Sequence, residues 1–142
     1  MKFRWLVTLG ALATLAGSSA FAQTEPTLRV NVPFEFKINN AVMPAGEYSI
    51  SNSGLQDLGV MAMRSDDNEH TVLFTGTAAS PNTPVNRSSL EFHRYGNSYF
   101  LADIWWAEGS AGLELPRTKT EKELAKSARL HRPDQVVLVA SR

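Results

Sequence analysis

Residues 30–50, VNVPFEFKINNAVMPAGEYSI, are the most regularly patterned stretch of the chain and decide its fold class. With Leu28 just before them, they place an apolar side chain at every second position as far as Ile38, with polar residues and Pro33 in between. A period of two is typical of a strand that buries one face in a core. Because Pro33 has no N–H group, it is expected at the edge of a sheet or beside a bulge.

Two turn-forming segments follow this strand. Residues 39–40, Asn-Asn, form the first, and residues 44–46, Pro-Ala-Gly, form the second. Proline presets φ for a turn, and Gly46 is expected to supply the positive φ that closes it. Tyr48 and Ile50 then resume the alternation. Backbone geometry accounts for every unusual residue here, so the stretch predicts a β-hairpin rather than a binding site.

The rest of the chain consists of short apolar runs separated by turn-forming segments. Residues 65–70, SDDNEH, predict a solvated hairpin tip rather than a calcium loop, because they lack the glycine and the ligand spacing of such a loop. Residues 79–89 are rich in proline, asparagine and serine and predict a long loop. Strands are expected at residues 28–38, 58–64, 71–77, 90–95, 99–106 and 135–140.

The hairpin expected at residues 90–106 has two possible registers. A two-residue turn would pair Phe92 with Leu101, whereas a three-residue turn would pair Phe92 with Phe100. A shift of one residue exchanges the two faces of a strand. The sequence therefore leaves open which of the two tryptophans at the end of this hairpin points inward.

One helix is expected late in the chain. Thr118 and Glu121 form a capping box, and Leu124 and Ala128 share a narrow apolar face, which predicts a short helix on the surface of a β-core. About seven strands with one late helix indicate a mainly β fold, namely a small antiparallel β-sandwich or a partly closed barrel. A fully up-and-down, lipocalin-like barrel is the alternative.

The chain begins with MKFRWLVTLGALATLAGSSAFAQ. Two basic residues precede an apolar run at 6–17, and small residues at the end of the segment allow cleavage after Ala22. This order is typical of a secretory signal peptide, and the apolar run is too short to span a bilayer. It predicts a leader at residues 1–22 and a single β-rich domain at residues 23–142. No twin arginine is present, so we expect export by the general secretory route to the periplasm or the extracellular space.

Composition limits the possible partners and cofactors. The sequence contains no cysteine, which excludes disulfides and a lipid-anchored precursor. Without the leader, 12 basic and 14 acidic residues remain, so there is no electrostatic reason to expect a nucleic-acid partner. No later segment is long and apolar enough to span a membrane. The histidines, His70, His93 and His131, lack metal-binding spacing, and we expect neither a metal nor another cofactor.

The candidates for ligand contacts lie in the apolar run YFLADIWW, residues 99–106. Asp103 interrupts this run, and burial would raise its pKa and suit it to act as a general acid. We expect instead a structural carboxylate that is bonded to a nearby backbone amide or arginine. Tyr99, Trp105 and Trp106 can stack on a sugar or fill a partner's pocket when exposed, and pack in the core when buried. We expect core packing for the tryptophans, with the outward ring covered by the late helix or a neighbouring loop. No catalytic residue is assigned, because no motif such as GxSxG is present.

Four segments carry a resemblance to other proteins: VPFEF, MPAGEY, RYGNSYFLADIW and the helix RTKTEKELA. Their order resembles a group of short, secreted proteins of acidobacterial genomes that have no assigned activity. The resemblance covers most of residues 23–142, and its motifs are turns, aromatic residues and a helix cap. It implies a Gram-negative envelope or secreted setting and supplies no catalytic residues.

These observations favour a secreted or periplasmic, non-enzymatic β-domain that binds a ligand or partner in the cell envelope, such as an envelope polymer, a lipid or a protein. Two alternatives stay open. The first is a lipocalin-like barrel that holds a small apolar ligand between its strands. The second is a hydrolase whose acidic residues or serine come together only in the folded chain.

Overall fold

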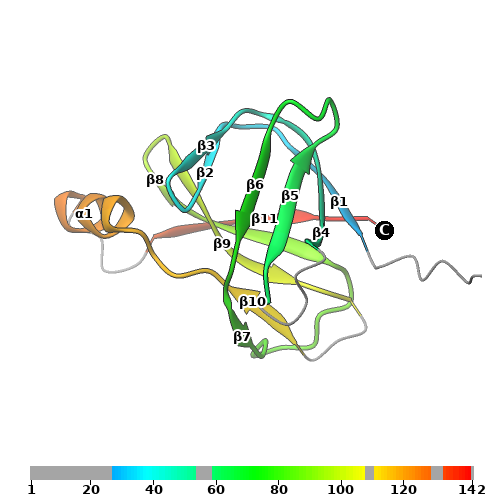
Figure 1. The fold of residues 1–142 in the computed structure, drawn as a ribbon. Helices are drawn as coiled ribbons and strands as arrows, with labels where there is room; N and C mark the ends of the chain where they lie inside the picture. The colour runs from blue at the N-terminus through cyan, green and yellow to red at the C-terminus, as the bar shows by residue number, and fades with distance from the viewer. Residues whose placement is uncertain (1–26, 54–58, 108–110, 129–132, 142) are drawn as a thin grey trace, which may run out of the picture.

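The computed structural model describes residues 27–53, 59–107, 111–128 and 133–141, and the predicted leader lies outside these ranges. The described residues form eleven strands and one helix, which confirms a mainly β fold with one short helix late in the chain (Figure 1). The elements are β1 (Leu28–Val32), β2 (Phe36–Ile38), β3 (Ala41–Met43), β4 (Gly46–Asn52), β5 (Met61–Ser65), β6 (Thr71–Phe74), β7 (Thr77–Ala79), β8 (Ser89–Tyr95), β9 (Ser98–Trp105), β10 (Gly112–Glu114), α1 (Lys119–Ser127) and β11 (Asp134–Val139).

The strands form two sheets that curl around a common core (Figure 1). A four-stranded sheet has the order β1-β4-β5-β6, and a seven-stranded sheet contains the order β11-β8-β9-β10-β7, with the β2–β3 hairpin attached to β9. One bridge joins the sheets: the amides of Arg29 and Ser141 donate to each other's carbonyls at 2.7 and 2.8 Å. The chain also passes from β6 to β7 within residues 75–76. The result is a partly closed barrel.

The opening stretch forms the expected hairpin, with a second hairpin inside it. β1 and β4 pair antiparallel from Val32 opposite Gly46 to Leu28 opposite Ile50. The prediction of one continuous strand at residues 28–38 is wrong, because β1 ends before Pro33 and β2 belongs to the other sheet. Proline cannot donate to a sheet ladder, so the chain changes sheets at this residue while its apolar alternation continues.

The expected positive φ at Gly46 is also wrong. Gly46 opens β4 in the pairing with Val32, and the described glycines with positive φ are Gly59 and Gly96. The tight reversal occurs earlier, in the two-residue turn that begins with Asn39, whose φ is 53°. Residues 44–45 connect β3 in one sheet to β4 in the other, so this segment crosses between sheets and needs no left-handed residue.

Short edge strands explain why the structure has more strands than the sequence predicted. The single strand expected at residues 71–77 is divided into β6 and β7 by Gly76. A Cβ added at Gly76 would lie 2.6 Å from the carbonyl oxygen of Glu114, so only glycine lets the chain pass this close to β10. Strands of three residues, such as β3, β7 and β10, are too short to show a clear period.

The β8–β9 hairpin has the two-residue turn. Gly96 has a φ of 61°, Tyr95 lies opposite Ser98, and Phe92 lies opposite Leu101. A bulge between Glu91 and Phe92 shifts the register in the rest of the hairpin. This irregularity determines which side chains of β9 share a face with those of β8, and the sequence pattern gave no sign of it.

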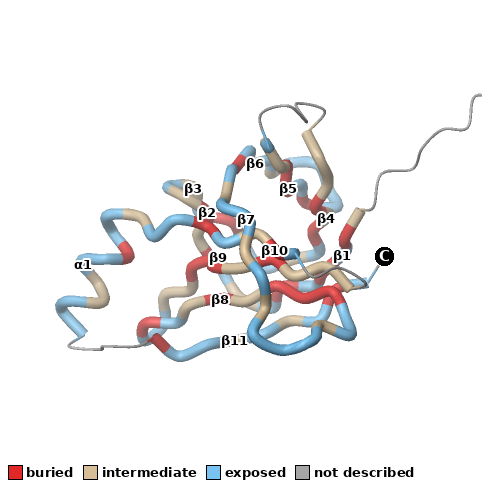
Figure 2. Tube along the Cα trace, turned by 90° about the horizontal axis from the view of Figure 1, so that it is seen from below, coloured by how far each residue is buried: buried red, intermediate tan, exposed pale blue. Residues whose placement is uncertain are grey.

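Aromatic side chains join the two sheets through the core. Phe36 is 1 % exposed and makes edge-to-face contacts with Tyr48 of the four-stranded sheet and Phe92 of the seven-stranded sheet, at centroid distances of 5.3 and 5.4 Å. In Figure 2 the buried positions concentrate on β1, β8 and β9, whereas α1 carries a single buried position. The core is therefore shared by both sheets.

The late helix begins as the sequence predicted. Thr118 is the N-cap, and its hydroxyl accepts a hydrogen bond from the amide of Glu121 at 3.2 Å. The helix has nine residues, and none of the described residues forms a helix long and apolar enough to cross a membrane.

Candidate functional site

Three carboxylates lie side by side on the seven-stranded sheet. Asp103 on β9 lies opposite Glu91 on β8 and opposite Glu114 on β10. We call these three residues the acidic row. Within the described part of the chain, no cationic side chain forms an ion pair with any of them. Like charges directly opposite one another on neighbouring strands are destabilising. The acidic row therefore lowers the stability of the fold, and core packing does not explain why three carboxylates occupy these positions.

The pKa of Asp103 reflects this environment. Burial, followed by the charges of Glu91 and Glu114, raises the pKa of Asp103 from 3.8 to about 6, while His93 and Arg117 act in the opposite direction. Burial is the condition under which the sequence analysis expected a raised pKa at this position, and burial is the largest cause here. Near neutral pH the carboxyl group can therefore exchange a proton with a ligand or with solvent.

Trp105 lies on the same side of β9 as Asp103. Its indole N–H donates to Oε2 of Glu91 at 3.4 Å. Its ring covers Gly112 of β10, where an added Cβ would come within 2.1 Å of a ring atom. We expected cover of the outward tryptophan by the late helix or a neighbouring loop, and α1 does not cover Trp105, because α1 lies near the turn between β8 and β9, at the other end of the sheet (Figure 1).

Tyr99 and Trp106 pack against the core instead. The ring of Tyr99 stacks on Phe34 at a centroid distance of 3.9 Å, and Trp106 is half-buried against the core cluster. The four residues proposed from the sequence therefore separate: Asp103 and Trp105 share the outer face of the sheet, and Tyr99 and Trp106 face inward. The two-residue turn and the bulge together produce this division.

A buried carboxylate holds α1 on the sheet. Glu121 is 3 % exposed, and its Oε1 lies 2.8 Å from Nδ1 of His93 and accepts a hydrogen bond from the Tyr95 hydroxyl at 3.1 Å. Arg117 lies 3.8 Å from the same oxygen. Burial and the nearby charge of Glu121 raise the pKa of Tyr95. His93 thus has a structural partner, which explains its position without a metal.

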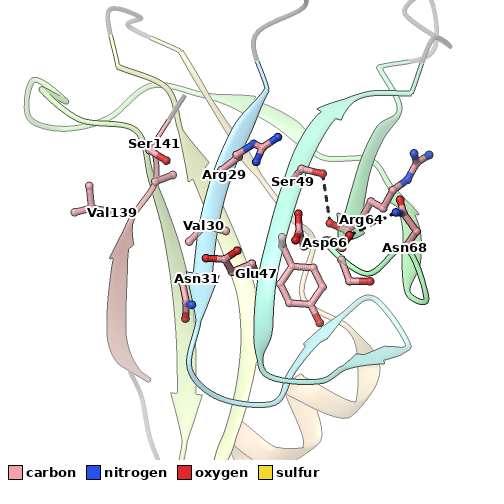
Figure 3. Close-up of a pocket in the computed structure, with 13 residues that line it drawn as sticks. Arg29, Val30, Asn31, Glu47, Ser49, Arg64, Asp66, Asn68, Val139 and Ser141 are labelled. Carbon is pink, nitrogen blue, oxygen red and sulfur yellow. Dashed lines mark hydrogen bonds between the residues drawn. The ribbon is translucent and has the colours of Figure 1, made fainter.

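A second region, which the sequence analysis did not identify, is a hollow on the four-stranded sheet (Figure 3). Its volume is about 560 Å³, within the range of small-molecule sites. Val139, the last residue of β11, forms one end of the hollow together with the following Ala140 and Ser141. The β5–β6 turn forms the other end. The polar side chains that line it include Arg29, Asn31, Glu47, Ser49, Arg64 and Asp66.

The register arranges these side chains in two rows across the strands. Arg29 lies opposite Ser49, which lies opposite Arg64, and we call these three residues the arginine row. Asn31 lies opposite Glu47, whose carbonyl accepts a hydrogen bond from the amide of Asp66 at 2.9 Å, and we call these the carboxylate row. The two rows are one strand period apart, about 7 Å.

The charges in the hollow have no ion-pair partner within the described part of the chain. Among the described residues, neither arginine and neither carboxylate of the two rows forms an ion pair or a side-chain hydrogen bond. The period of two in residues 28–38 puts Arg29 and Asn31 on the polar face of a strand, but it does not say which strands pair with it. Only the register that joins β1, β4 and β5 brings the two rows together.

The hairpin tip at residues 65–70 resembles a catalytic cluster only in composition. The Ser65 hydroxyl donates to Asp67 and accepts a hydrogen bond from the amide of His70 at 2.9 Å, and Asn68 has a φ of 62°. The hydrogen bonds that Asp67 accepts from the Ser65 hydroxyl and from the amide of Glu69 lower the pKa of Asp67 and close the turn. No serine hydroxyl bonds to an imidazole of the described residues, and no group of at least three potential ligands there could hold a metal ion.

Comparison with known proteins gives no match: no family model, no curated protein and no solved structure is similar to this chain at a significant level.

Proposed function

We propose that this protein is an exported, non-enzymatic β-domain that binds a small polar ligand in the cell envelope. The observation that carries the proposal is the hollow on the four-stranded sheet, which combines a suitable volume with charged groups of both signs that have no partner among the described residues. Export rests on the sequence of the leader and on the resemblance to secreted proteins.

The lipocalin-like alternative has less support. Such a protein needs an apolar cavity, and the hollow described here is lined mainly by charged and polar side chains. Aromatic residues such as Phe36 and Phe92 occupy the space between the sheets.

A ligand screen tests the proposal. The purified protein is melted in the presence of saccharides, short peptides and lipids, and a ligand that raises the melting temperature is then titrated against variants. We expect Arg64→Gln to weaken binding, with Arg87→Gln in the exposed loop before β8 as the matched control. If the affinity for the ligand were unchanged in Arg64→Gln but binding were abolished in Trp105→Ala, the binding site would lie on the seven-stranded sheet instead.

Export has its own test. We expect the protein recovered outside the cytoplasm to begin at Gln23, which mass spectrometry of the intact protein measures. Recovery of a chain that begins at Met1 in the membrane fraction would contradict the leader prediction.

A second candidate function rests on Asp103. A carboxylic acid with a pKa of about 6, beside other carboxylates and an aromatic ring, is the arrangement that glycoside hydrolases use. It ranks second because Asp103 does not line the hollow on the four-stranded sheet. Hydrolysis of chromogenic aryl glycosides that is abolished by Asp103→Asn would establish it, and unchanged hydrolysis in that variant would exclude it.

A further inference from the structure

The two rows of the hollow define a dipolar surface. Arg29 and Arg64 are exposed, and their positions on β1 and β5 flank that of Ser49 on β4. Each guanidinium has five N–H donors and recognises a carboxylate or phosphate through paired hydrogen bonds. The arginine row is therefore suited to an anionic group.

The carboxylate row has the opposite preference. Glu47 and Asp66 are exposed and neighbouring, because the backbone amide of Asp66 bonds to the carbonyl of Glu47. Carboxylates only accept hydrogen bonds, and an ammonium group provides three donors. This row is suited to an amine, and the amide of Asn31 beside it can bond to a neutral polar group of the same ligand.

The distance between the rows limits the ligand. Side chains that point the same way along a strand are about 7 Å apart. Two residues of extended chain also span about 7 Å, so the terminal amine and carboxylate of a free dipeptide match the spacing. A ligand with a single charge would satisfy one row and leave the other unpaired.

We propose that the hollow binds a compact zwitterion with an amine and a carboxylate about 7 Å apart, as in a free dipeptide. The arginine row binds the carboxylate, and the carboxylate row binds the amine. This inference rests on the proposed function and adds the class of ligand. The charged side chains that line the hollow are exposed, which suits a soluble ligand whose charges stay partly hydrated.

Calorimetric titration with three probes tests the inference. Glycylglycine carries both charges, N-acetylglycylglycine carries only the carboxylate, and glycylglycinamide carries only the amine. We expect glycylglycine to bind at least about tenfold more tightly than either blocked probe, because each blocked probe loses one set of charge-assisted hydrogen bonds.

Variants assign each charge to a row. Arg64→Gln should weaken binding of N-acetylglycylglycine about tenfold and leave glycylglycinamide unchanged, and Glu47→Gln should have the reverse effect. The matched controls are Arg87→Gln and Glu35→Gln, which change exposed charges outside the hollow and should leave all three affinities unchanged.

Two results would overturn the inference in distinguishable ways. Equal affinity for glycylglycine and for one blocked probe, with the expected loss in Arg64→Gln or Glu47→Gln, would show that the hollow binds a singly charged ligand, and the proposed function would stand. Absence of binding by all three probes would reject the zwitterion. If the wider screen then gave only ligands insensitive to both variants, the proposed function would fail as well.

Discussion

Asp103 lies between two carboxylates on neighbouring strands, and burial together with these charges raises its pKa to about 6. The carboxyl group is protonated in both the folded and the unfolded chain well below pH 4. As the pH rises from about 4 to 6, the unfolded chain releases this proton first, so ionisation of Asp103 increasingly disfavours the folded state. Above about pH 6 the full cost applies, and a difference of about two pKa units corresponds to about 3 kcal/mol at most.

We expect Asp103→Asn to raise the free energy of unfolding by about 1 to 3 kcal/mol at pH 7 and to change it little at pH 4. The amide removes the cost of burying a charge and the repulsion by Glu91 and Glu114, both of which operate only when the side chain is ionised. Urea denaturation at the two pH values measures both quantities. If Asp103→Asn lowered the free energy of unfolding equally at pH 7 and pH 4, the carboxyl group would have a structural role instead.

Two glycines form a matched pair for a second prediction. Gly112→Ala should destabilise by about 1 to 3 kcal/mol, because the new Cβ would lie 2.1 Å from the Trp105 ring and 2.8 Å from the carbonyl oxygen of Ile104. Gly46→Ala should change stability by less than about 0.5 kcal/mol, because its Cβ would meet only Tyr48, at 4.0 Å. Thermal melts compare the two. A loss of stability in Gly46→Ala larger than about 0.5 kcal/mol would indicate that Gly46 adopts a positive φ, which the structure does not show.

Helix α1 is attached by polar contacts more than by an apolar face. Its one buried residue is Glu121. Of the residues expected to form the apolar face, Leu124 is half-buried and Ala128 is exposed. A buried carboxylate is costly unless it is paired, and here His93 and Tyr95 supply the partners. The position of the helix therefore depends on one side chain.

We expect Glu121→Ala to destabilise by about 1 to 3 kcal/mol, because it leaves the buried Tyr95 hydroxyl without its acceptor. Hydrogen exchange should show faster exchange of the amides at residues 122–127, which measures release of the helix from the sheet. Glu123→Ala is the control, since Glu123 is exposed on the same helix. The same increase in both variants would mean that Glu121 acts only through helix propensity.

At the scale of the whole molecule, the two sheets share one core and meet at the Arg29–Ser141 bridge. Phe36 contacts an aromatic ring from each sheet. The core cluster contains side chains of both sheets, so packing in the core joins them. This predicts that the sheets unfold together.

Phe36→Ala should lower the free energy of unfolding by about 3 to 5 kcal/mol, the cost of a large cavity in a core. Unfolding should remain a single transition followed equally by tryptophan fluorescence and by circular dichroism. Phe34→Ala should cost less, because Phe34 is only half-buried. Two separate transitions in the Phe36 variant would show that the sheets are independently stable.

The sequence by itself determined the fold class, the late helix and its cap. These features depend on local chemistry: the period of two in residues 28–38, the turn at residues 39–40, and the hydroxyl of Thr118 beside the amide of Glu121. It also singled out Asp103 as the acid within an apolar strand whose pKa burial would raise, but whether that position is buried depends on the fold.

Only the tertiary structure decided which residues share a face. The bulge after Glu91 aligns it with Asp103, and the crossing at Pro33 sends β1 and β2 to different sheets. The hollow depends on the register of three strands, which brings Arg29 and Arg64 to the two sides of Ser49. Strand partners and registers are set by the packing of a shared core over long sequence separations, so no local pattern carries this information.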